Sequence, residues 1–190
     1  MSLPNRLTIA RIFLTFVFLF FALQIGVIPK IIAVAVFLFA SLTDFYDGYY
    51  AKKYNLTSDF GKLMDPIADK FLVLTAFFVF VVRHLIPAWM FILIFAREVA
   101  VTCIRLRVLR RGKVLAAEQA GKIKTVLQIV AIFIILIFMI LAEINLPGSW
   151  SARLLGQFYK GIYGLMLVVV VVTLFSGGSF LWNNRRSVYA

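Results

Sequence analysis

The sequence has few of the residues that usually bind metals or crosslink a small protein. Its 190 residues include one cysteine, Cys103, so we expect no disulfide framework and no cysteine metal site. The single histidine, His84, stands beside Arg83 and Pro87, where we expect a solvated turn. Acidic residues are also scarce: eight Asp and Glu stand against twenty Lys and Arg, a net charge of +12. The basic residues are interleaved with apolar runs, so we expect anionic lipid or substrate rather than nucleic acid as partner.

Apolar residues, in contrast, dominate the chain. They make up 63% of it and the mean hydropathy is +1.00, whereas soluble domains contain about 45–50% apolar residues. This composition predicts one all-α domain over residues 1–190, a polytopic membrane protein of six transmembrane helices behind a short N-terminal interfacial helix. The apolar runs place the spans at residues 12–28, from 31 into the acidic segment, 62–82, 88–107, 122–146 and 154–175, the last with an extension to 182 as an alternative.

The distribution of basic residues predicts the orientation of these spans. With the N-terminus inside, most Lys and Arg fall in inner segments, and the expected outer turns hold only Lys30, Arg83, Arg153 and Lys160. The positive-inside rule therefore places both termini and the acidic segment on the cytoplasmic side of the inner membrane.

The acidic residues are concentrated in one short segment. Five of the eight lie between residues 44 and 69, namely Asp44, Asp47, Asp59, Asp65 and Asp69. In helices, residues three or four apart share a face, so the sequence predicts two carboxylate pairs that confront each other across a helix contact. Clustered carboxylates repel one another unless cations bind them, and an all-oxygen site suits Mg²⁺, Mn²⁺ or Ca²⁺. We therefore expect a divalent-metal site, because ionisable residues this close to a bilayer are usually functional.

The same segment resembles the signature of the CDP-alcohol phosphotransferases, a family of membrane enzymes. It reads D-x-x-D-G-x-x-A-K-x8-G-x3-D-x3-D, and the family has Arg where Lys52 stands. The resemblance implies a metal-dependent phosphatidyltransferase with two Mg²⁺ ions, Mn²⁺ being the alternative, held by Asp44, Asp47, Asp65 and Asp69. It also implies that Asp69 is the general base. The residues expected to contact CDP-diacylglycerol are Asn5, Thr8, Arg11, Gly48, Ala51, Lys52 and Gly61.

A second group of residues is basic. REVAVTCIR at residues 97–105 and GKIKTVLQ at residues 121–128 resemble the corresponding region of bacterial phosphatidylglycerophosphate synthases, as does LPNRLTIAR at residues 3–11. This resemblance implies that the phosphate of glycerol 3-phosphate binds Arg97, Arg105, Lys122 and Lys124. The alternative is structural: Arg97 would pair with Glu98 or a signature carboxylate, and the other three would be ordinary positive-inside charges.

The expected reaction is transfer of a phosphatidyl group from CDP-diacylglycerol to sn-glycerol 3-phosphate, with release of CMP. The same chemistry with phosphatidylglycerol, inositol phosphate or serine is an alternative, although a basic pocket disfavours serine. A divalent-cation transporter is the alternative from another class, but the outer halves of the spans are nearly pure hydrocarbon and offer no ion path. Relatives in the family are often homodimers, which we expect here too.

Overall fold

The part of the chain that the structure describes contains six α-helices. The computed structural model describes residues 3–54, 59–110, 119–144 and 149–189, and within them the side chains of residues 9–43, 70–108, 121–144 and 155–185. The helices are α1 (Leu3–Leu23), α2 (Val27–Tyr54), α3 (Asp59–Val82), α4 (Ala88–Arg110), α5 (Gln119–Glu143) and α6 (Ser149–Tyr189). No strand occurs in these residues, which confirms the expected all-α class.

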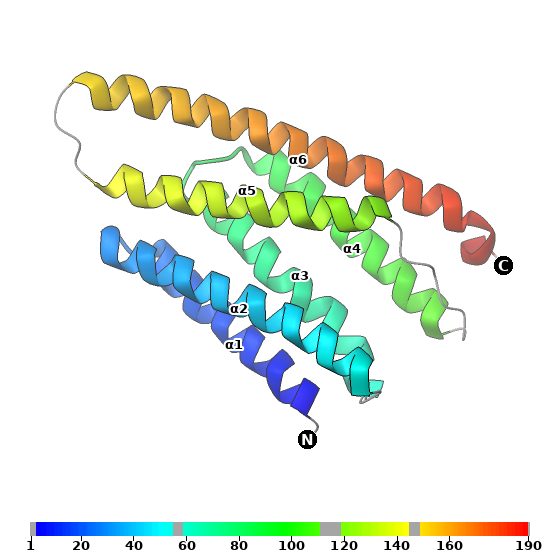
Figure 1. Cartoon of the computed structure of the whole chain (residues 1–190). Helices are drawn as coiled ribbons and strands as arrows, with labels where there is room; N and C mark the ends of the chain where they lie inside the picture. The colour runs from blue at the N-terminus through cyan, green and yellow to red at the C-terminus, as the bar shows by residue number, and fades with distance from the viewer. Residues whose placement is uncertain (1–2, 55–58, 111–118, 145–148, 190) are drawn as a thin grey trace.

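The helices form one bundle in which successive helices run in opposite directions (Figure 1). α1 packs on α2, and α5 packs on α6. α3 joins the two pairs because it contacts α1, α2, α4 and α5, while α4 also packs against α6. An even number of helices brings the two chain ends to the same end of the bundle. The C-terminal ends of α2 and α4 and the N-terminal ends of α3 and α5 lie at that end as well (Figure 1).

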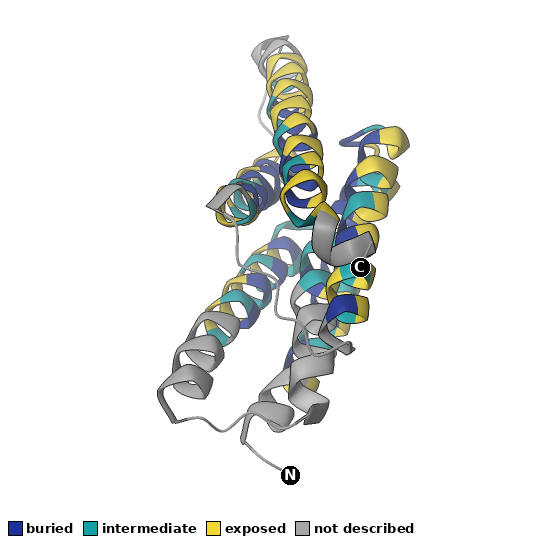
Figure 2. Cartoon of the chain, turned by 90° about the vertical axis from the view of Figure 1, so that its right-hand side faces the viewer, coloured by how far each residue is buried: buried dark blue, intermediate teal, exposed yellow. Residues whose placement is uncertain are grey.

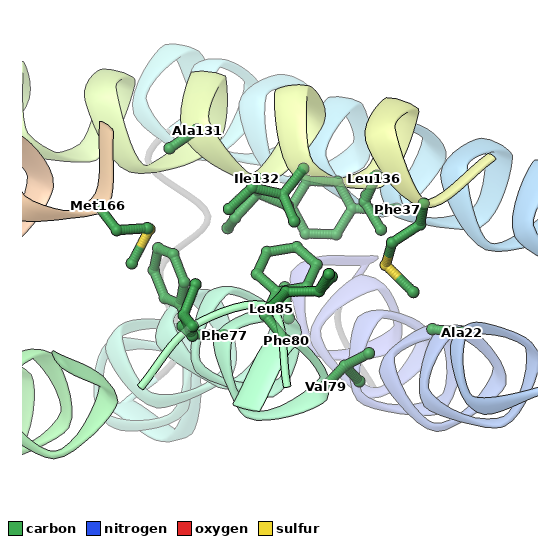
Figure 3. Close-up of a cluster of buried hydrophobic side chains, with 14 of the residues drawn as sticks. Ala22, Phe37, Phe77, Val79, Phe80, Leu85, Ala131, Ile132, Leu136 and Met166 are labelled. Carbon is green, nitrogen blue, oxygen red and sulfur yellow. The ribbon is translucent and has the colours of Figure 1, made fainter. Parts of the chain in front are cut away.

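Aromatic and aliphatic side chains fill the centre of the bundle. Phe37, Phe77, Phe80, Ile132 and Met166 are fully buried and converge from α2, α3, α5 and α6 (Figure 3). Rings meet edge to face, as in the pair Phe77 and Phe80, whose centroids are 6.2 Å apart. This packed core is the rigid framework that positions the polar residues described below.

The outer surface of the bundle is also apolar. Phe13, Phe20 and Phe175 are each at least 60% exposed, and exposed residues follow the outward faces of the helices (Figure 2). A soluble monomer rarely exposes large contiguous apolar surface. The apolar helices therefore indicate a membrane protein. Two of them, at Gly121–Glu143 and Leu155–Arg185, are long and apolar enough to cross a bilayer within the described part of the chain. Six spans remain a prediction.

Two expected helix boundaries near the N-terminus were wrong. The short N-terminal helix is not a separate element, because α1 runs without a break from Leu3 to Leu23. The first span was expected to reach residue 28 and end at Pro29, but the chain turns at Gly26, which has a φ of 109°. Glycine adopts such a φ without strain, and proline is tolerated in the first turn of a helix, where Pro29 lies. The continuous apolar run concealed this turn.

Three charged residues hold the turn between α1 and α2, and we call Lys30, Arg83 and Glu143 the turn cluster. The Lys30 ammonium donates to the backbone oxygen of Ala22 at 2.8 Å and lies 3.9 Å from the Glu143 carboxylate. Arg83 Nη2 donates to the backbone oxygens of Leu23 at 2.6 Å and of Gln24 at 2.7 Å. The two cations thus cap the C-terminal end of α1, where carbonyl groups lack helical partners. Lys30 is therefore a buried residue of α2 and not part of an outer turn.

Candidate active site

The signature residues lie where two helices approach the same end of the bundle. Asp44 and Asp47 belong to the last part of α2, and Asp65 and Asp69 belong to the first half of α3. α2 and α3 contact each other directly. The expected arrangement of two helices carrying two carboxylates each is therefore present at the backbone level. The side chains of the signature lie outside the described residues, as do those of Asn5, Thr8, Gly48, Ala51, Lys52 and Gly61.

Lys70 is the first side chain described after the signature. It follows Asp69 in α3, and its ammonium donates to Glu98 Oε2 at 3.0 Å. This contact fixes α3 against α4 one residue beyond the last signature aspartate. The position of Lys70 links the acidic segment to the basic region on the neighbouring helices.

Glu98 is the centre of a buried ionic cluster, which we call the cavity cluster: Lys70, Arg97, Glu98 and Lys124. Glu98 is 2% exposed. Its Oε1 accepts from Arg97 Nη1 at 3.2 Å and also from the Lys124 ammonium, which itself is 4% exposed. One carboxylate therefore compensates three cations. The pairing of Arg97 with Glu98, which the sequence left open, is present in the structure.

The three cations of this cluster also line a cavity between α3, α4, α5 and α6. The cavity has a volume of about 400 Å³. Its polar lining consists of Lys70, Arg97, Arg105, Lys122, Lys124, Thr125 and Ser176, and its apolar lining includes Val101 and Phe180. We call it the basic cavity, because five basic residues and no acidic residue line it among those described. The structure thus brings together all four residues for which acceptor-phosphate binding was expected.

A smaller cavity shares Lys70 and Lys124 with the basic cavity. It measures about 110 Å³ and is lined by Lys70, Glu98, Lys124 and Gln128, with Arg11 contributed by α1. Arg11 is 3% exposed and its backbone oxygen accepts a hydrogen bond from Thr15 at 2.8 Å. Arg11 is the one residue expected to contact the nucleotide whose side chain is described, and it lies next to the cavity cluster. Its role in nucleotide binding stays a prediction.

Several site residues were not predicted from the sequence. Glu98 was considered only as a partner of Arg97, although a single acid in an apolar helix beside several bases signals a buried ionic centre. Ser176 and Phe180 of α6 line the basic cavity, and Thr173 accepts a hydrogen bond from Gln128 at 3.3 Å. α6 reads in the sequence as a plain apolar span, so no local pattern identified these contacts.

The chemistry of the basic cavity is suited to a small ligand with more than one negative charge. Arginine offers a planar fork of donors for phosphate oxygens, and lysine adds a compact charge. Burial among apolar helices strengthens these interactions because the surroundings are less polar than water. Glu98 lowers the repulsion among Lys70, Arg97 and Lys124 without entering the lining of the basic cavity. The arrangement therefore presents surplus positive charge to a ligand.

Comparison with known proteins agrees with this chemistry. The sequence model of the family described as CDP-alcohol phosphatidyltransferase matches residues 1–175. The chain is 43% identical over 176 residues to the CDP-diacylglycerol–glycerol-3-phosphate 3-phosphatidyltransferase of Bacillus subtilis (strain 168), with 86% of this chain and 91% of the relative covered. It is 38% identical over 183 residues to the protein of the same name from Rickettsia typhi (strain ATCC VR-144 / Wilmington), with 94% of each chain covered.

A third relative, from Mycobacterium tuberculosis (strain CDC 1551 / Oshkosh), is named as a probable phosphatidylglycerophosphate synthase. It is 38% identical over 190 residues, with 98% of this chain and 83% of the relative covered. These matches extend across both the acidic signature and the basic region. The chain therefore belongs to the CDP-alcohol phosphatidyltransferase family.

Proposed function

We propose that the protein transfers the phosphatidyl group of CDP-diacylglycerol to sn-glycerol 3-phosphate, forming phosphatidylglycerophosphate and releasing CMP. The observation that carries this choice of acceptor is the basic cavity, with Arg97, Arg105, Lys122 and Lys124 on its wall. The names of the most similar relatives specify the same reaction. Family membership supports a transferase and gives no support to the alternative of a cation transporter.

The charge of the basic cavity distinguishes among the acceptors. A phosphate monoester carries nearly two negative charges at neutral pH and presents three oxygens to basic side chains. Serine has no phosphate, and the phosphodiester of phosphatidylglycerol carries a single charge. Inositol phosphate shares the monoester, so only its bulkier ring separates it from glycerol 3-phosphate. We therefore assign the cavity to the phosphate of a small acceptor.

The acidic signature fits the divalent ions that the family implies. Four aspartates on two contacting helices provide only oxygen ligands, the donor set that Mg²⁺ and Mn²⁺ prefer. We propose that Asp44, Asp47, Asp65 and Asp69 hold them. Bound divalent ions would supply positive charge beside the diphosphate.

In the reaction that we propose, Asp69 takes the proton from the free primary hydroxyl of glycerol 3-phosphate. The hydroxyl oxygen forms a bond to the phosphorus that carries diacylglycerol, and the bond from that phosphorus to CMP breaks. Lys70 connects the helix of Asp69 to Glu98 and hence to the basic cavity. The protein thus holds the acceptor phosphate on one side and the hydroxyl near the base on the other, a task of positioning and electrostatics.

The membrane arrangement belongs to the same proposal. Six spans, with both chain ends and the acidic signature on the cytoplasmic side of the inner membrane, would let CMP and glycerol 3-phosphate exchange with the cytoplasm. The location of both chain ends, the C-terminal end of α2 and the N-terminal end of α3 at one end of the bundle supports this orientation (Figure 1). The lipid tails would stay in the bilayer, against the apolar helix faces. A homodimer remains a prediction, and sedimentation in detergent of matched density would test it.

The experiment that tests this function measures CMP release by the purified protein in detergent with CDP-diacylglycerol and Mg²⁺. We expect release that depends on metal and glycerol 3-phosphate and is absent with serine. CMP release with phosphatidylglycerol or inositol phosphate, but not with glycerol 3-phosphate, would support the proposed reaction type and contradict the proposed acceptor. No release with any of these acceptors, from folded protein, would overturn the function.

The matched variants for this assay are Asp69→Asn and Asp59→Asn. Both remove one charge from the acidic segment, but Asp59 lies outside the signature. We expect Asp69→Asn to lower kcat by about 10²–10⁴-fold, the usual contribution of a general base. Asp59→Asn should stay within about twofold of the unchanged protein, because Asp59 is not one of the signature aspartates. Equal losses in the two variants would contradict the role assigned to Asp69.

A further inference from the structure

The basic cavity has a wall that the family signature does not include. α6 carries none of the residues expected to bind substrate or metal, yet Ser176 and Phe180 line the cavity beside the arginines of α4. Ser176 and Phe180 are one helical turn apart, so they share a face of α6. Ser176 is 1% exposed and Phe180 is 3% exposed. Both side chains are therefore fixed by packing and face the interior of the bundle.

Ser176 contacts the guanidinium of Arg97. Arg97 Nη2 donates to Ser176 Oγ at 2.9 Å, while Nη1 of the same group donates to Glu98 Oε1 at 3.2 Å. One nitrogen is thus held by α6 and the other by α4. A guanidinium held at both terminal nitrogens keeps a single orientation, so the direction of its plane relative to the cavity is set by the packing of α6 on α4.

Gly177 lets the stem of Arg97 cross the surface of α6. A Cβ at Gly177 would lie 3.0 Å from Arg97 Cγ and 3.1 Å from Arg97 Nε, closer than most real contacts. A Cβ at the neighbouring Gly178 would have nothing within 4 Å. The requirement for glycine at residue 177 is therefore specific to the path of this arginine, and it is not a requirement of the helix.

Phe180 contacts the second arginine of α4. The Arg105 Cζ lies 5.7 Å from the centroid of the Phe180 ring, within the range of a cation–π contact. Arg97 and Arg105 are eight residues apart in α4, and Ser176 and Phe180 meet them in corresponding order along α6. The two helices therefore hold two cations at the cavity at once, although the cations repel each other.

We propose that Ser176, Gly177 and Phe180 are positioning residues that hold Arg97 and Arg105 in the geometry that binds the phosphate of the acceptor. The proposal rests on the proposed function, because it concerns the same cavity. An arginine loses much rotamer freedom when it binds a ligand, and a fork that the protein already orients loses less. α6 would thus increase the affinity for the acceptor without touching it.

The test compares Gly177→Ala with Gly178→Ala. Both substitutions add one methyl group to the same helix and remove the same backbone freedom, but only the first displaces Arg97. We expect Gly177→Ala to raise KM for glycerol 3-phosphate on the order of tenfold, because small misplacements of a binding group are costly. KM for CDP-diacylglycerol and the thermal unfolding midpoint should change little. Gly178→Ala should match the unchanged protein in both KM values, and its unfolding midpoint should be equal or slightly higher, because alanine favours the helix.

Ser176→Ala provides a second, milder variant, because it removes one oxygen and adds no bulk. We expect it to raise KM for glycerol 3-phosphate about threefold with an unchanged KM for CDP-diacylglycerol. If Gly177→Ala fails to fold, this variant decides the question. An unchanged KM for glycerol 3-phosphate in every folded variant would overturn the positioning role, as would equal rises for both substrates. If the unchanged protein releases no CMP with glycerol 3-phosphate, the proposed function itself fails, so the two failures are distinguishable.

Discussion

The turn cluster and the cavity cluster have similar compositions but different surroundings. Each contains one glutamate together with lysine and arginine, and in each at least one lysine pairs with the glutamate. α5 contributes to both, through Glu143 and Lys124, which are 19 residues apart and hence separated by about 28 Å along the helix. In the turn cluster the cations donate to backbone oxygens at the end of α1. In the cavity cluster they converge on Glu98 and line an open cavity.

This difference indicates a structural role for the turn cluster and a binding role for the cavity cluster. Carbonyl groups at a helix end need donors, so Lys30 and Arg83 satisfy a requirement of the fold itself. The cavity cluster has three cations for one carboxylate, and Arg105 and Lys122 add two more charges to the same cavity. Lys70, Arg97 and Lys124 donate to the side chains of Glu98 and Ser176, whereas Lys30 and Arg83 donate to a helix end. Burial alone does not distinguish the two clusters. The hydrogen-bond acceptors of their cations do distinguish them, because one set is backbone oxygens and the other is side chains.

The largest effect is expected from Glu98→Gln, which removes the charge at the centre of the cavity cluster while keeping its volume. Three cations, of which Lys124 is buried, would then lack their carboxylate, and loss of one partner of a buried ion pair typically costs about 3–5 kcal/mol. We expect a loss of unfolding free energy near the lower value, measured by denaturant titration in mixed micelles, together with a raised KM for glycerol 3-phosphate. Glu98→Asp, which keeps the charge, is the control. An undiminished stability for Glu98→Gln would contradict the central role of this carboxylate.

Arg97→Lys should have an intermediate effect, and only on activity. Lysine keeps the positive charge and the pairing with Glu98 but loses the planar fork that reaches Ser176. We expect KM for glycerol 3-phosphate to rise about tenfold, equivalent to one charge-assisted hydrogen bond, while the unfolding midpoint is retained. Steady-state kinetics with each substrate varied in turn would measure this. A rise in KM for CDP-diacylglycerol alone would contradict the assignment of Arg97 to the acceptor site.

The smallest effect is expected in the turn cluster, and only on stability. Arg83→Met keeps the stem but removes the donors to the backbone oxygens of Leu23 and Gln24, which should lower the unfolding free energy by about 1 kcal/mol. Glu143→Gln is a milder companion that weakens an ion pair at 3.9 Å but retains an oxygen for the backbone nitrogen of Gly26. Both variants should keep the kinetic constants of the unchanged protein. A changed KM for glycerol 3-phosphate in either variant would contradict the purely structural role of the turn cluster.

The helices were predictable because their cause is local. Long apolar runs can satisfy backbone groups in a membrane only within helices or closed barrels, and the expected and observed helices overlap throughout. The wrong predictions concern helix boundaries. They occur where apolar composition does not mark a turn, as at Gly26, or where glycine does not end a helix. The pair Gly177 and Gly178 lies inside a continuous α6, which runs to Tyr189 and so passes both the expected end at residue 175 and the alternative at residue 182. Packing against α4 and α5 overrides the weak helix propensity of glycine at these residues.

The sequence by itself determined the apolar helical class, the acidic signature on two consecutive helices and the two basic segments at residues 97–105 and 121–128. Each of these depends on composition or on spacings of three and four residues, which a helix converts directly into shared faces. Only the tertiary structure decided that Glu98 is the common partner of three cations and that Ser176 binds Arg97 across 79 residues of sequence. Such contacts depend on which helices pack together and in what rotation. No local periodicity specifies that information, because the packing is a property of the whole bundle.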